Sequence, residues 1–69
     1  MHREKIYHIV PGKDGNWDVK EEGRDEPLAT YRTQQEAVEN AKTRAEEHKP
    51  GSFVVHDTSG EPRYEHTYR

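Results

Sequence analysis

A single helical segment divides the chain and limits what the remaining residues can form. Thr33-Gln34-Gln35-Glu36 matches a capping box, in which Thr33 accepts from the Glu36 amide and Glu36 reaches back. Small apolar residues then recur at spacings of three and four, which gives one narrow stripe: Ala37, Val38, Ala41 and Ala45. Lys49-Pro50-Gly51 ends the helix because proline cannot continue it. Since the stripe is so small, we expect the helix to lie close to a sheet that supplies the larger side chains.

Short β-type segments lie on both sides of this helix. Four of them pair into two predicted hairpins: Ile6–Val10 with Trp17–Glu21, and Phe53–His56 with Arg63–Tyr68. Residues 12–16 and 57–60 include the Gly, Asp and Asn residues that tight turns favour. Leu28–Arg32 is either a third short strand or an extended lead-in to the helix. The sequence therefore predicts an α+β fold in the order β-β-(β)-α-β-β: an antiparallel sheet of four or five strands, with one helix packed on one face.

The chain has few apolar residues for a folded domain. The chain has 69 residues, of which 28% are hydrophobic and 36% charged, and it contains no cysteine. We therefore expect one domain over residues 1–69, with residues 1–5 as a flexible tail and a stability of only a few kcal/mol. Nearly every apolar residue is needed for the expected core: Ile6 or Ile9, Val10, Trp17, Val19, Leu28, Ala37, Val38, Ala41, Ala45, Phe53 or Val54, Val55 and Tyr64.

The charges argue against several classes of partner. Eleven basic and fourteen acidic residues give a net charge of −3, and neither sign forms a long run. This distribution gives no basic patch of the kind that binds anionic membranes or, non-specifically, nucleic acid. No apolar run is long enough to cross a bilayer, and the charged segment Met1–Lys5 does not resemble a signal peptide. A cytoplasmic location is the expectation.

The order of these segments also resembles a known family. YHIVPGKDGNWDVK, the TQQEAVENAKTRAEE helix and FVVHDTSGEPRYEHTY are similar to the small bacterial family catalogued as domain of unknown function 2188. The resemblance runs from Tyr7 to Tyr68. Ile9 stands where Val is commoner in the family, and Thr58-Ser59 extends the Asp-Gly turn. The resemblance implies a small α/β domain. The family has no established activity, so the resemblance identifies no catalytic residue.

No residue pattern predicts a cofactor, a metal or catalysis. His8, His56 and His66 all lie in predicted strands, and three imidazoles could bind zinc, but their spacing does not show convergence. Residues 12–15 (GKDG) resemble a phosphate loop only superficially, because a strand follows them rather than a helix. With no cysteine and little volume for a pocket, we expect that the protein is not an enzyme.

Interaction with another macromolecule is the favoured function. Tyr7 and Ile9 point opposite to Ile6, His8 and Val10, so this strand carries apolar groups on both faces. A second copy or another protein covering one face would explain this, although a few exposed apolar residues need no explanation. The predicted interaction face is Tyr7, Ile9, Val54, His56, His66 and Tyr68. The alternative is nucleic-acid binding on the open sheet face, with stacking by Tyr7, Tyr64 and Tyr68 and phosphate contacts from Lys5, Lys20, Arg24, Arg32 and Arg63.

Overall fold

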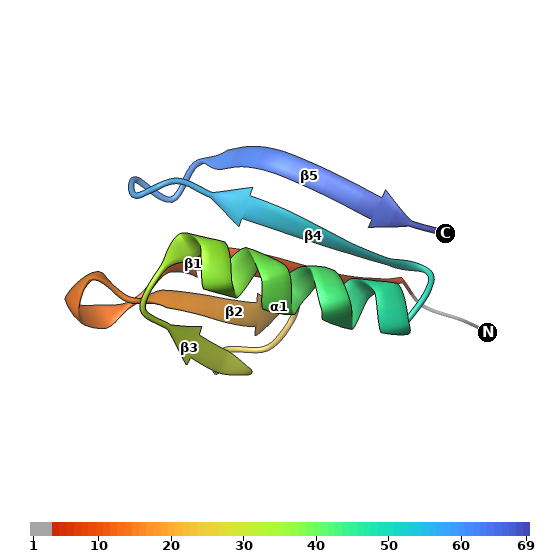
Figure 1. Cartoon of the computed structure of the whole chain (residues 1–69), viewed down its shortest axis with the longest axis horizontal. Coiled ribbons are helices and arrows are strands. Elements are labelled where there is room, and N and C mark those ends of the chain that lie inside the picture. The colour runs from red at the N-terminus through yellow and green to blue at the C-terminus, as the bar shows by residue number, and fades with distance from the viewer. Residues whose placement is uncertain (1–3) are drawn as a thin grey trace.

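In the computed structural model, which describes residues 4–69, five strands form one layer and a helix lies across one side of it (Figure 1). The elements are β1 (Lys5–Pro11), β2 (Trp17–Glu21), β3 (Ala29–Tyr31), α1 (Gln34–Glu47), β4 (Gly51–His56) and β5 (Pro62–Tyr68), with a short 3-10 turn, Lys13–Gly15, between β1 and β2. The α+β class and the single helix are confirmed, and Leu28–Arg32 does contain a third strand. Residues 1–3 of the predicted tail lie outside the described residues, and Lys5 already belongs to β1.

The sheet is mixed, which differs from the antiparallel sheet that we expected. Its order is β3-β2-β1-β4-β5. β1 pairs antiparallel with β2 but parallel with β4, so that Tyr7 lies opposite Phe53. The reason is the position of α1, which connects β3 at one edge to β4 beyond β1. A helix that crosses over a sheet returns the chain in its original direction, and β3 runs the same way as β1.

The helix begins where the capping pattern predicts. The Glu36 amide donates to Thr33 Oγ1 at 3.2 Å, and the Thr33 hydroxyl donates to Glu36 Oε1 at 3.1 Å. The carboxylate of Glu36 thus accepts from the threonine hydroxyl, whereas the capping box predicts the Thr33 backbone amide as its partner. The helix ends at Glu47, just before the Lys49-Pro50-Gly51 stop.

The core lies between α1 and the central strands. Within residues 4–69, seven hydrophobic residues are buried: Tyr7, Ile9, Val19, Ala37, Ala41, Ala45 and Phe53. Trp17, Val38 and Val55 are partly buried against them. Two predicted core residues are instead exposed, Leu28 by 37% and Tyr64 by 57%. Leu28 lies in the loop just before the edge strand β3, and Tyr64 lies in the other edge strand, β5, whereas α1 packs mainly on β4, β1 and β2. Val10, also predicted for the core, lies instead on the other side of the sheet with Ile6 and Val54, and all three residues are half-buried.

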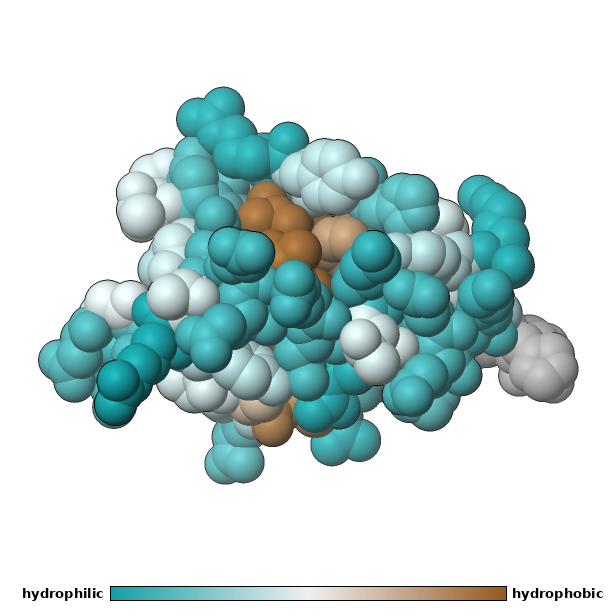
Figure 2. Space-filling model, viewed as in Figure 1, coloured by the Kyte–Doolittle hydropathy of each residue, from teal (hydrophilic) through white to brown (hydrophobic). Residues whose placement is uncertain are grey.

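The helix side of the molecule is mostly hydrophilic. Figure 2 shows apolar atoms on this side only in small areas, one of them between α1 and β4. Among residues 4–69 no helix is long and apolar enough to span a membrane.

Candidate functional site

Two histidines meet on the sheet face opposite α1, which we call the open face. His8 alternates with the buried residues Tyr7 and Ile9 of β1, so its side chain projects from the other side of the sheet. In the parallel register His8 lies opposite Val54, and His56 follows two residues later on the same face of β4. His8 Nδ1 is 3.0 Å from His56 Nε2, and the ring centroids are 5.2 Å apart. We call these two residues the histidine pair.

The outer nitrogen of each ring in the histidine pair has its own acceptor. His56 Nδ1 lies 3.1 Å from the Gly60 carbonyl oxygen, and His8 Nε2 lies 3.0 Å from Glu22 Oε1. A carbonyl and a carboxylate only accept hydrogen bonds, so both outer nitrogens carry hydrogen. In neutral imidazoles, each inner nitrogen then presents a lone pair to the other. With the outer nitrogens occupied in this way, the two inner nitrogens face each other as potential metal ligands.

The β4–β5 turn positions the Gly60 carbonyl. Asp57 Oδ1 accepts from the backbone amides of Ser59 and Glu61 at 2.9 and 3.0 Å, and from the Ser59 hydroxyl at 2.6 Å. Asp57 Oδ2 accepts from Arg63 Nε at 2.7 Å. Gly60 has a φ of 89°, which glycine adopts without strain, and its amide closes the turn on the Asp57 carbonyl at 2.9 Å. The predicted turn over residues 57–60 is thus confirmed.

Acid should weaken this turn. The Ser59 hydroxyl, then Arg63, then the Glu61 amide hold the pKa of Asp57 well below its usual range. A lowered native pKa stabilises the fold above the unfolded pKa of about 3.9, and the contribution is lost as the pH falls below that value. Asp57→Asn should therefore be less stable than the native protein at neutral pH. The difference should shrink at about pH 3, as measured by paired thermal melts. A stability difference between Asp57→Asn and the native protein that does not change with pH would contradict this role of Asp57.

The structure does not bring the six residues of the predicted interaction face together. Tyr7 and Ile9 are 2% and 0% exposed and lie beneath α1, so they are core residues and not surface residues. Burial, with a smaller contribution from Glu21 and opposed by Arg44, raises the pKa of the Tyr7 phenol.

The other four predicted residues divide between the two sides of the sheet. Val54 and His56 lie on the open face. His66 packs on the helix side, with its ring centroid 6.1 Å from that of Phe53 and 4.5 Å from that of Tyr68. Only two of the three strand histidines therefore converge.

The residues of the nucleic-acid hypothesis are also divided. Tyr64 and Tyr68 lie opposite Val55 and Gly51 in the β4–β5 register, and their rings gather around Phe53 on the helix side. Lys20 pairs with His8 across β1 and β2 and so projects from the open face. Arg63 is held by Asp57.

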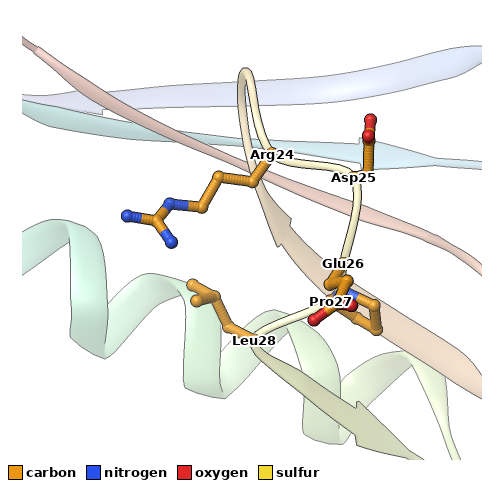
Figure 3. Close-up of a pocket in the computed structure, with 5 residues that line it drawn as sticks. All are labelled: Arg24, Asp25, Glu26, Pro27 and Leu28. Atoms are coloured by element: carbon orange, nitrogen blue, oxygen red, sulfur yellow. The ribbon is translucent and has the colours of Figure 1, made fainter.

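The hollows on the surface are shallow. One of about 520 Å³ is formed by five consecutive residues between β2 and β3: Arg24, Asp25, Glu26, Pro27 and Leu28. In Figure 3, Arg24 extends to the same side as Leu28, whereas Asp25 points away from both. The charged groups of this loop therefore do not converge. A second hollow, of about 420 Å³, borders the histidine pair and is also lined by Glu22 and Arg24.

One known protein family matches almost the whole chain. The family described as "Uncharacterized protein conserved in bacteria (DUF2188)" matches residues 7–68, from β1 to the end of β5. The chain belongs to the DUF2188 family. No curated protein and no solved structure gives a significant match to the chain. This DUF2188 domain therefore has an α+β fold with a histidine pair on its open face.

Sequence reasoning missed the partners of the histidine pair in this DUF2188 domain. Glu22 follows the end of β2, and Gly60 lies in the β4–β5 turn. Neither has a motif that identifies it. The available signal was weaker: both histidines alternate with apolar residues in strands that flank turns, so each side chain had a definite face, but the pairing of β1 with β4 was not predicted.

Proposed function

We propose that this DUF2188 domain is a non-catalytic interaction module that associates with a second copy of itself through strand β5. The observation that carries the proposal is the position of β5. It is seven residues long, it lies last in the order of the sheet, and its first five residues are exposed. An edge strand of this length offers unpaired backbone groups to another strand. The other edge, β3, has only three residues and offers far fewer.

The charges along β5 are complementary to themselves. If two copies pair antiparallel about Tyr64, Arg63 of each copy lies opposite Glu65 of the other, and the two Tyr64 rings lie side by side. The Nε atom of Arg63 donates to Asp57 of its own copy, and the other guanidinium nitrogens would contact Glu65. Opposite charges and aromatic pairs across strands each contribute roughly 0.2–1 kcal/mol. This arrangement is isologous, as a twofold dimer requires.

The packing of α1 also supports association at β5. The helix has few contacts with this strand, and Tyr64 is 57% exposed. A continuous sheet through two copies would cover the Tyr64 ring and add apolar burial to a chain of which only 28% is hydrophobic. Nucleic-acid binding on the open face has less support, because its stacking tyrosines lie on the other side of the sheet or in the core.

Light scattering and sedimentation test this proposal. The native protein should become dimeric as its concentration rises into the high micromolar range, and Glu65→Arg should weaken dimerisation by about tenfold or more, because Arg would then face Arg in both cross-strand pairs. Glu39→Arg is the matched control, since it makes the same change of charge on the exposed side of α1. A native protein that stays monomeric, or equal dimerisation of both variants, would overturn the proposal.

Mixing two variants gives a sharper version of this experiment. Glu65→Arg has two basic residues on its β5 face, and Arg63→Glu has two acidic ones. Each variant alone should dimerise more weakly than the native protein, whereas the equimolar mixture should form a heterodimer with all charge pairs restored. Circular dichroism checks that both variants are folded. A mixture that associates no better than its components would exclude the Arg63–Glu65 register.

A further inference from the structure

The histidine pair has the organisation of ligands in a metal site. Histidines that bind metals commonly donate their other ring N–H to a carboxylate or a backbone carbonyl, which fixes the tautomer and the orientation of the ring. His8 and His56 each do so, to Glu22 at 3.0 Å and to Gly60 at 3.1 Å. The two inner nitrogens are then both free to donate a lone pair. We propose that His8 Nδ1 and His56 Nε2 bind one divalent transition-metal ion of the zinc, nickel or copper type.

The separation of the two inner nitrogens suits one ion. With metal–nitrogen bonds of about 2.0–2.1 Å, two ligands at angles between about 90° and 110° lie about 2.8–3.4 Å apart. The observed distance between His8 Nδ1 and His56 Nε2 is 3.0 Å. Imidazole nitrogen is a preferred ligand of these ions. Since the two inner nitrogens already lie at the required spacing, an ion can bind both of them without movement of the strands.

The surroundings leave the remaining coordination positions open. Within residues 4–69, no set of three or more His, Asp or Glu side chains is placed to hold an ion. The site therefore has two protein ligands, and water or a partner group completes it. The neighbouring hollow is lined by two carboxylates and two cationic side chains: Glu21, Glu22, Lys20 and Arg24. These charges balance, so the two imidazoles are the source of affinity, and the binding is expected to be modest.

Titration of the untagged protein with zinc chloride in a non-chelating buffer tests the site. Long-range nitrogen–proton NMR spectra resolve each imidazole. Zinc should shift His8 Nδ1 and His56 Nε2 while the outer nitrogens keep their hydrogens. His8→Gln and His56→Gln should each reduce zinc affinity by about tenfold or more. Glu22→Gln should reduce it by about tenfold, as loss of an outer partner does.

His66→Gln is the matched control, because His66 is a strand histidine on the opposite side of the sheet. Its zinc affinity should stay within about twofold of the native value, since it removes no ligand. Calorimetry measures the affinities, and dispersed amide spectra confirm that each variant is folded. The proposal is overturned if zinc shifts only the other histidines, or if the double variant His8→Gln, His56→Gln binds zinc as well as the native protein. The native NMR spectra decide the question even if a variant fails to fold.

Discussion

Ile9→Ala should lower the free energy of unfolding by about 3–4 kcal/mol, which is close to the whole stability expected of so small a domain. Ile9 is fully buried in the central strand, where it lies opposite Val19 on one side and Val55 on the other. Removing its outer atoms leaves a cavity beneath α1. The surrounding alanines of the helix are too small to fill that cavity. Urea denaturation followed by circular dichroism measures the loss.

Ile6→Ala is the matched control for this change. It removes the same atoms from the same strand, but Ile6 is half-buried on the open face, away from α1. We expect a loss of about 1 kcal/mol, because less apolar area is returned to water and no closed cavity forms. Similar losses for the two variants would show that the open face is packed as tightly as the helix side.

Gly51→Ala is the second change with a large expected effect, a loss of about 2–3 kcal/mol. Gly51 begins β4 directly beneath the end of α1. A Cβ atom there would lie 2.7 Å from the Ala45 carbonyl oxygen and 2.9 Å from that of His48. Both obstacles are backbone atoms, so the end of the helix would have to move away from the sheet. Thermal and urea melts measure the effect.

Gly12→Ala provides the comparison for this substitution. Its added Cβ would come equally close to another atom, 2.8 Å from Asp18 Oδ1. A carboxylate can rotate away, however, and Gly12 has a φ of −107°, which alanine adopts readily. We expect a loss of less than about 1 kcal/mol, partly offset by the lower entropy of the unfolded chain. An equal or larger loss for Gly12→Ala would show that the Ala45 and His48 carbonyls do not decide the outcome at Gly51.

Local patterns predicted the elements of this fold well. Thr33 and Glu36 marked the start of the helix, and alternation located β2 at Trp17–Glu21. What they could not predict was which strands are neighbours. The parallel pairing of β1 with β4 depends on contacts between residues far apart in the sequence, and no turn specifies it.

The choice of face in β1 was ambiguous for a physical reason. Apolar residues occupy both sides of this strand, so alternation alone does not decide whether Ile6 or Ile9 is buried. This ambiguity placed Tyr7 and Ile9 on the expected interaction surface. The histidine pair was missed for a related reason, because its two members come together only once β1 and β4 are adjacent.

The central position of β1 has a consequence for the order of folding. Its pairing with β2 closes a short loop and can form early, but its pairing with β4 joins residues far apart in the sequence, such as Lys5 and Gly51. Closing that long loop reduces the conformational entropy of the chain, and this cost comes before the core contacts form. Docking of β4 against β1 is therefore expected to limit the folding rate. Substitutions at this junction should slow folding, whereas those at the β2–β3 edge should mainly speed unfolding.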